Sequence, residues 1–406
     1  MKKLLVLAFF LTLGNAGSAQ NNPLPAWEKG YLDIHFINTG RGDAAFIIMP
    51  DGSSLLVDAG DLDSDAESMV AAVPDKSKSP GEWIADYIHQ FHPKGKDAVL
   101  DYALLTHYDS DHMGSMNFRK RVHEKGDYGL SGMSEVGSII PIGKIIDRGD
   151  DFLQNTGESQ SQKKERIAEY RKFLSYAEDA QGLRYEKFKV GSVDQIKMLH
   201  HANEYPEFVV KNLFANGEIA AVRDTTVAFR RFDATDDPSE NNLSLGIRIS
   251  YGAFDFYTGG DIPGIGHTSA PDPQSMESYA APVIGDVDVA TLNHHGNRDS
   301  QNEFFVRMLQ PRVWICQSWT IRHPGEDVLR RIMSPWVYPG ERDLFITSLH
   351  KINESYIGES RAKDFTSKRG HLVVRVYQGG DKYNVFVLND LSQEREVLAR
   401  HQYRSK

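Results

Sequence analysis

The chain has 406 residues, of which 40% are apolar and 25% are charged, close to the averages of soluble globular proteins. This composition excludes a fibrous or disordered protein and provides enough apolar residues for a large core. Acidic residues outnumber basic ones by 56 to 46, which gives a formal net charge of −10. Because proteins that grip long nucleic acid usually carry a basic stripe, this balance disfavours a nuclease without excluding one.

The first nineteen residues have the pattern of a secretory signal peptide. Lys2 and Lys3 form a positive start, residues 4–13 a short apolar run, and residues 17–19 (Gly-Ser-Ala) a small-residue cleavage site. A membrane anchor is the alternative, but the apolar run is shorter than the ~20 residues that a membrane-spanning helix requires. We therefore predict a signal peptide at residues 1–19, a secreted or periplasmic protein, and no stable membrane anchor after cleavage.

Metal-binding side chains gather in residues 107–112, which read His-Tyr-Asp-Ser-Asp-His. The apolar residues 103–105 before them predict a strand that delivers this segment to the edge of a sheet. Two imidazoles and two carboxylates converging there form a donor set for zinc, manganese or iron. The alternative is a solvated turn that is rich in Asp and His by chance. We predict four metal ligands in this loop: His107, Asp109, Asp111 and His112.

This loop resembles the H-x-H-x-D-H signature of the metallo-β-lactamase superfamily, with Asp109 where the second histidine usually stands. The variant is similar to the β-lactamase-like domain of the ComEC-type DNA-uptake competence proteins. Further segments follow in that family's order at residues 37–44, 56–60, 240–245, 258–261, 294–296 and 323–324. The likeness runs from about residue 31 to about residue 350, and several motifs in order are more specific than any one of them.

The resemblance implies an α/β (α+β) fold, a four-layer αββα sandwich of two mixed β-sheets. We expect one hydrolase domain over residues 31–350, with an insertion at about 150–235 that matches no core motif. Residues 351–406 form a C-terminal extension packed on the same domain. Alternating apolar residues at 372–377 and 383–388, joined by a Gly-Gly turn, predict a terminal β-hairpin in it.

The resemblance also implies a centre of two divalent metal ions, zinc or manganese. His107 and Asp109 would hold one ion, Asp111 and His112 the other, and Asp261 would bridge both. A late histidine would complete the second site. Among His294, His295 and His323, the order of the motifs favours His323 as the ligand.

His294 and His295 are candidates either for metal binding or for contact with the substrate. For each of the three late histidines, the alternative is a purely structural, hydrogen-bonded role. Two features depart from the family. Residues 240–242 (Glu-Asn-Asn) occupy the stretch where many members carry another histidine, so we expect one ion to be held weakly. Arg298 follows the His-His-Gly motif and either faces a phosphate or pairs with Asp299.

Two adjacent cations activate water for hydrolysis and polarise the bond under attack. Asp111 is the candidate proton acceptor, with His295 and Arg298 as further catalytic candidates. Asp109 adds a hard oxygen donor, which favours manganese or magnesium and a phosphodiester substrate, either a small molecule or a nucleic acid. We predict a secreted phosphodiesterase or nuclease. An ester, lactone or amide hydrolase and a non-catalytic exported binding module with a structural metal stay open, and protein partners are unknown.

Overall fold

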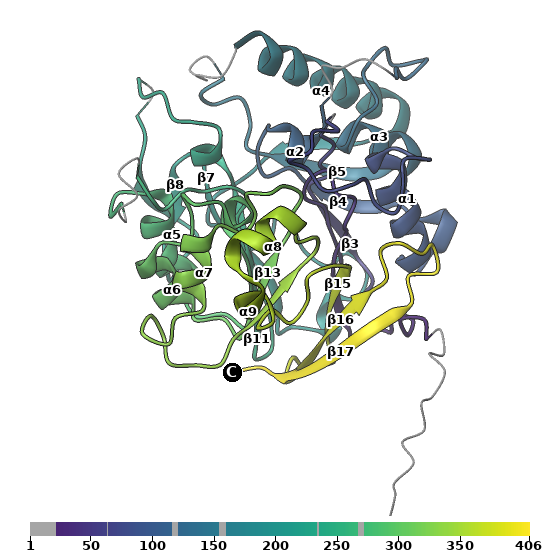
Figure 1. Ribbon diagram of the computed structural model, residues 1–406. Coiled ribbons are helices and arrows are strands. Elements are labelled where there is room, and N and C mark those ends of the chain that lie inside the picture. Colours follow the sequence, from purple (N-terminus) through teal and green to yellow (C-terminus); the bar gives the residue numbers. More distant parts are fainter. Residues whose placement is uncertain (1–21, 63, 116–120, 154–159, 234, 267–271) are drawn as a thin grey trace, which may run out of the picture.

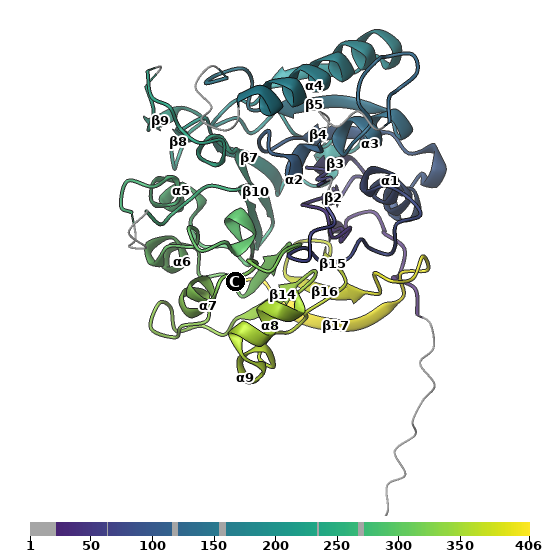
Figure 2. The ribbon, with the colours of Figure 1, turned by 45° about the horizontal axis from the view of Figure 1, so that its top comes forward.

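The computed structural model describes residues 22–406 apart from 63, 116–120, 154–159, 234 and 267–271, so the predicted signal peptide lies outside the described residues. Two β-sheets pack face to face, and helices cover the outer face of each sheet (Figure 1). The same four layers are visible from a second direction in Figure 2. The predicted αββα sandwich of two mixed sheets is confirmed.

The first sheet combines strands from both ends of the chain. Within the described residues it has nine strands: β1 (Leu32–Phe36), β2 (Ala45–Ile48), β3 (Ser54–Val57), β4 (Leu100–Leu104), β5 (Ile142–Asp147), β6 (Arg184–Lys187), β15 (His371–Val376), β16 (Lys382–Leu388) and β17 (Val397–Arg404). Their order is β17-β16-β15-β1-β2-β3-β4-β5-β6. The strands from β3 to β6 are parallel, and the other neighbours are antiparallel.

The second sheet comes from the middle of the chain. Its eight described strands are β7 (Phe208–Ala215), β8 (Glu218–Ala220), β9 (Val227–Arg230), β10 (Gly246–Tyr251), β11 (Phe254–Thr258), β12 (Val289–Thr291), β13 (Val313–Cys316) and β14 (Asp343–Ile346). They run in the order β14-β13-β12-β11-β10-β7-β8-β9. The strands from β11 to β14 are parallel, so their carboxyl ends lie at one edge of the sheet.

The helices divide between the two outer faces. The first sheet is covered by α1 (Pro80–Phe91), α3 (Met133–Ile139) and α4 (Gln160–Gln181), and the second by α5 (Met276–Ile284), α6 (Glu303–Leu309) and α7 (Glu326–Ile332). Two short helices, α8 (Lys351–Ile357) and α9 (Glu359–Ala362), follow β14. No helix in the described part of the chain is long and apolar enough to cross a membrane.

Helix α1 shows how local sequence sets an element. Ser79 caps its first turn in a reciprocal capping box with Glu82, and Pro80 at the first helical position has no amide hydrogen that would need a partner. Trp83 and Tyr87, one helical turn apart, lie on the buried face of the helix. The apolar face therefore fixes the helix against the first sheet.

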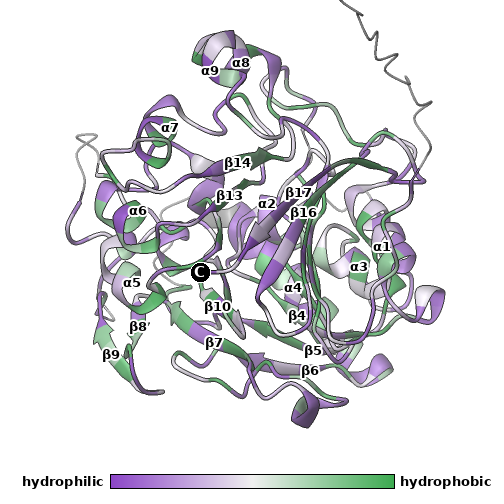
Figure 3. Cartoon of the chain, turned by 90° about the horizontal axis from the view of Figure 1, so that it is seen from below, coloured by the Kyte–Doolittle hydropathy of each residue, from purple (hydrophilic) through white to green (hydrophobic). Residues whose placement is uncertain are grey.

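Three apolar cores correspond to the three contacts between layers. One core lies between the sheets and joins residues such as Ile34 of β1 and Phe256 of β11. The second packs α1, α3 and α4 on the first sheet, and the third packs α5, α6 and α7 on the second sheet. Apolar residues follow the strands of both sheets, whereas hydrophilic residues are frequent on the peripheral helices and loops (Figure 3).

The predicted insertion and the C-terminal extension both contribute strands to the two central sheets. The predicted insertion at 150–235 contains β7, which is largely buried and pairs with β10 inside the second sheet. The C-terminal residues supply the expected hairpin of β15 and β16, and β15 pairs with β1. They also add β17, which the sequence patterns did not predict. Strands from both segments thus belong to the core of the sandwich.

Candidate metal centre

The predicted metal loop follows β4 and runs into a one-turn helix, α2 (Ser110–Met113). His107 and Asp109 precede α2, and Asp111 and His112 lie in its first turn. The strand next to β4 ends at the same edge, where Asp58 follows β3 and its amide donates to the carbonyl of Leu104 at 2.9 Å. Carboxyl ends of parallel strands thereby bring these side chains together.

The second sheet supplies the other half of the centre. Asp261 follows β11, and His294 and His295 follow β12 in the short 3₁₀ segment Asn293–Gly296. Both histidines adopt positive φ, +48° for His294 and +54° for His295. Such backbone strain in non-glycine residues is concentrated at functional sites. The carboxyl ends of β11 and β12 therefore present these side chains to the loop after β4.

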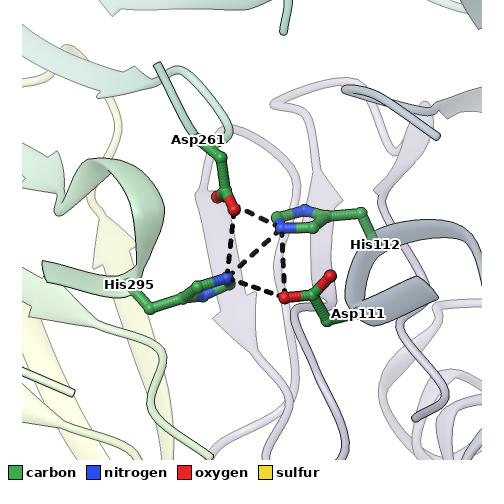
Figure 4. A group of neighbouring side chains, drawn as sticks. All are labelled: Asp111, His112, Asp261 and His295. Carbon is green, nitrogen blue, oxygen red and sulfur yellow. Dashed lines mark hydrogen bonds and ion pairs between the residues drawn. The ribbon is translucent and has the colours of Figure 1, made fainter. Parts of the chain in front are cut away.

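Four side chains converge so closely that they offer a complete metal-binding group. Asp111, His112, Asp261 and His295 each provide a ligand atom within 4.8 Å of the others (Figure 4). Nε2 of His112 is 3.1 Å from Oδ1 of Asp261, and Nε2 of His295 is 3.1 Å from Oδ2 of Asp111. Residues separated by up to 184 positions therefore meet in one cluster, hereafter the four-residue group.

The other ring nitrogens of these histidines are held by carboxylates, those of Asp58, which is buried, and Asp43, which is partly exposed. Nδ1 of His112 is 2.8 Å from Asp58, and Nδ1 of His295 is 2.9 Å from Asp43. Metal-bound histidines commonly have such a carboxylate partner, which fixes the tautomer and orients the free nitrogen. The functional roles of Asp43 and Asp58 were missed from the sequence, although both lie in the matching segments 37–44 and 56–60.

Polar atoms on the other side of Asp261 fit a cation. Nε2 of His107 and Oδ1 of Asp109 are buried and have no hydrogen-bond partner in the structure. Nε2 of His107 lies 3.6 Å from Oδ2 of Asp109 and 3.8 Å from Oδ2 of Asp261. Buried polar groups are rarely left without a partner, and the donor types of these atoms suit a divalent metal.

The electrostatics of the four-residue group are those of a charged, dehydrated site. Burial alone would raise the pKa of Asp111 and Asp261, but the neighbouring histidines lower it, to well below the usual range for Asp261. Burial would lower the pKa of His112 and His295, yet Asp261 and the other nearby carboxylates raise it well above its usual value. Without a metal ion, protons on these histidines compensate the carboxylates.

His323 lies next to the four-residue group but outside it. Its ring stacks on His295 with centroids 4.7 Å apart, and its Nδ1 is buried without a hydrogen-bond partner. Burial and the charges of His295 and His294 lower its pKa well below the usual value. The preference for His323 from motif order thus differs from the geometry, in which His295 is the late histidine that faces the carboxylates.

Arg298 has an exposed position near the centre. Its side chain is 74% exposed and lies 3.6 Å from Asp327. Asp299, the alternative partner of Arg298, contacts Nδ1 of His294 at 2.7 Å. Arg298 lines a cavity of about 450 Å³ together with Asn297 and Arg322, among others. The phosphate contact predicted for Arg298 stays a prediction.

Comparison with known proteins agrees with this geometry. No family model matches the chain. Over 307 residues the chain is 25% identical to ComE operon protein 3 of Bacillus subtilis, a match that covers 73% of this chain and 30% of that protein. The predicted resemblance to ComEC-type proteins is confirmed, and the matched region spans less than a third of that relative's length.

A comparison with solved structures found one that resembles this chain. It is that of human tRNase Z, short form, at 11% identity and a TM-score of 0.31, with 70% of this chain and 91% of that one covered. At this level of similarity the match carries no argument about activity. The fold and the cluster of Asp and His support a metal-dependent hydrolase.

Glu240 occupies the stretch where many metallo-β-lactamase-like proteins carry a further histidine. Its buried carboxylate accepts hydrogen bonds from the backbone amide of Tyr108 at 2.9 Å and from Arg148 at 2.7 and 2.9 Å, and it pairs with Lys163 of α4. Burial alone would raise the pKa of Glu240, but Arg148 and Lys163 lower it to about 2. Glu240 thus anchors the metal loop between His107 and Asp109.

Proposed function

We propose that this chain is a secreted, metal-dependent hydrolase that cleaves phosphodiester bonds. The observation that carries the proposal is the four-residue group, in which Asp111, His112, Asp261 and His295 lie within 4.8 Å of one another. Two carboxylates and two imidazoles form a donor set for a divalent ion such as manganese or zinc. When bound, such ions supply activated water and polarise the bond under attack.

Side-chain exposure indicates the direction from which substrate reaches the centre. His107, His112 and His295 are at most 1% exposed, whereas Asp109, Asp111 and His294 are 20%, 14% and 18% exposed. Substrate therefore approaches over these last three side chains. A cavity of about 570 Å³, lined by residues that include Asn241 and Asp299, adjoins His294 on that side.

Asp111 is suited to hold an ion and to orient water at the open side of the centre. Its lowered pKa keeps the carboxylate ionised near neutral pH, as a metal ligand requires. His112 and His295 are oriented by Asp58 and Asp43, so these carboxylates hold the site rigid without contacting substrate. Hydrolysis of a bound diester then depends on positioning and electrostatics rather than on a protein nucleophile.

The choice of a phosphodiester rests on the donor set and on the relative. Asp109 stands at a position where related sites carry a histidine, and its hard oxygen favours manganese or magnesium. These ions are commonly paired with phosphate substrates. The resemblance to the ComEC-type DNA-uptake proteins favours the same substrate class, which includes small phosphodiesters and nucleic acids. The signal-like residues 1–19 are the basis for proposing secretion or a periplasmic location.

Hydrolysis of bis(p-nitrophenyl) phosphate by the manganese-loaded protein tests this proposal. We expect turnover that is lost after chelation and in Asp261→Asn, whose folding is checked by circular dichroism. Glu303→Gln, an exposed change on α6, serves as the matched control and should keep full activity. A panel of carboxylic esters, lactones and amides runs in parallel, and cleavage of these alone would replace the phosphodiester proposal. A metal-loaded protein inert to the whole panel would indicate a binding module.

A further inference from the structure

The cavity beside His294 has walls from two separate segments of the chain. One wall comes from the segment that leads from β9 to β10, and the other from the segment between β11 and α5. Arg231 joins the two walls, because its Nε donates a hydrogen bond to the carbonyl oxygen of Gln274 at 2.9 Å. The volume of the cavity is about 570 Å³, which is typical of sites for small molecules.

The cavity adjoins the metal centre. Asn241 and Asp299 both line it, and they flank the two ring nitrogens of His294 at 3.3 and 2.7 Å. Nε2 of His294 is in turn 3.8 Å from Oδ2 of Asp261. A diester whose phosphate lies at the centre can therefore extend one of its two alcohol groups into this cavity.

The lining combines apolar surface with hydrogen-bond acceptors. Its apolar side chains are Phe232, Pro238, Pro263 and Ile265. The carboxylate of Asp237 is exposed and has no hydrogen-bond partner within the described part of the chain, and that of Asp272 accepts the backbone amide of Gln274 at 2.9 Å. A planar heterocycle has the matching properties, because its faces are apolar and its edge carries N–H donors.

The charge of the lining limits what enters the cavity. Asp237, Asp272 and Asp299 stand against the single cation of Arg231, whose guanidinium lies 5.1 Å from the ring of Phe232. This excess of negative charge disfavours a second phosphate, as does the net charge of −10 of the whole chain. An uncharged group thus fits the cavity better than a continuing chain of nucleotides.

We propose that this cavity binds the base of one terminal nucleoside of a phosphodiester substrate and prefers bases that carry an amino group. Asp237 and Asp272 accept hydrogen bonds from the amino group of cytosine, whereas uracil has a carbonyl oxygen at the same position. The inference rests on the proposed function and deepens it, because it specifies the substrate as a small nucleoside diester or the end of a strand.

Calorimetric titration of the manganese-loaded protein with CMP and UMP tests the preference without any need for turnover. The two nucleotides share the sugar and the phosphate, so a difference in affinity reports on the edge of the base. We expect CMP to bind at least about 10-fold more tightly than UMP. Combining Asp237→Asn with Asp272→Asn should reduce this ratio to about 3-fold or less, since the carboxylate charge is lost.

Two further variants support this comparison. Glu303→Gln, an exposed change on α6, is the control and should keep the full preference for CMP. Asparagine at position 272 still offers an oxygen to the amide of Gln274, which favours folding of the double variant. If that variant does not fold, Asp237→Asn alone, at an exposed residue, should still lower the ratio.

Competition against CMP tests whether a terminal nucleoside is bound. The dinucleotide CpC should displace CMP, whereas circular single-stranded DNA, which has no end, should not. A linear oligocytidylate that competes as well as CpC would place strand ends in the cavity, and one that competes poorly would restrict it to small diesters.

Equal affinities for CMP and UMP, an unchanged ratio in the aspartate variants, or displacement by circular DNA would each overturn the assignment of the cavity. A protein that prefers CMP but does not hydrolyse bis(p-nitrophenyl) phosphate would overturn only the proposed function.

Discussion

Asp58 lies 2.8 Å from Nδ1 of His112, on the side of the ring opposite the nitrogen that faces Asp261. Asp58 also accepts hydrogen bonds from the amide and the hydroxyl of Thr106, at 2.7 and 2.8 Å. The carboxylate of Asp58 therefore bonds both to the residue that follows β4 and to the imidazole of His112. The position of the end of β4 therefore sets the orientation of the His112 ring, a candidate metal ligand.

Asp58→Asn should weaken manganese binding by about 10–100-fold while the protein stays folded. Asparagine keeps an oxygen for the amide of Thr106 and tolerates the φ of +59° at this position, but it no longer offers a charged partner to His112. Calorimetric titration with Mn²⁺ measures the change. Asp390→Asn, a buried aspartate bonded to Asn38 and Arg369, is the control, and an equal loss in both variants would contradict a specific role for Asp58.

Metal affinity should rise with pH between about 5 and 8. In the metal-free protein nearby carboxylates raise the pKa of His112 and His295 well above its usual value, so protons occupy the ligand nitrogens at neutral pH. An ion must displace them, and each released proton changes the affinity by roughly tenfold per pH unit. Calorimetry in buffers of different ionisation enthalpy counts these protons. An affinity that does not vary with pH would show that the histidines are neutral before the ion binds.

Glu240→Gln should reduce the free energy of unfolding by about 3–5 kcal/mol, because it leaves the cations of Arg148 and Lys163 buried without their counter-charge. Urea unfolding followed by circular dichroism measures the loss. Glu218→Gln removes a more exposed pair with Arg230 and should change stability by less than about 1 kcal/mol. Similar small effects in both variants would contradict the anchoring role of Glu240.

Glu277 should make the folded state less stable as pH rises through about 7. This carboxyl group of α5 is fully buried, and burial raises its pKa from 4.5 to about 7, although Asn302, Asn293 and Gln301 donate hydrogen bonds to it. When the pKa of an acid is higher in the folded state than in the unfolded state, its contribution to stability is complete below the unfolded pKa, near 4.5. That contribution is lost as the pH rises to the folded pKa, and the free energy of unfolding then falls by about 3 kcal/mol.

Urea unfolding at pH 5 and pH 8 checks this sign for Glu277. The wild type should lose stability between the two values, and Glu277→Gln should show a smaller loss because it has no group to ionise. Loss of one hydrogen-bond acceptor should also reduce its stability at pH 5 by about 1–3 kcal/mol. The exposed change Glu303→Gln should keep the wild-type slope. A slope that persists in Glu277→Gln would assign the pH dependence to other groups.

Local patterns predicted individual strands, whereas the four-layer sandwich was predicted from the family resemblance. The apolar run before residues 107–112 predicted the strand that became β4, and alternation predicted the hairpin of β15 and β16. Two strands were not predicted, for different reasons. Strand β17 was missed because alternate residues are exposed at an edge, and β7 was placed in an insertion because its partner β10 lies over 30 positions later.

The sequence by itself determined that His107, Asp109, Asp111 and His112 lie together in one short segment at the end of a strand, because they are only a few positions apart. Only the tertiary structure decided that His295 faces these carboxylates and His323 does not. It also assigned Asp43 and Asp58 their contacts with the histidines. The physical reason is separation along the chain: short spacing fixes directions within a loop, whereas distances between strands of two sheets depend on how those sheets pack.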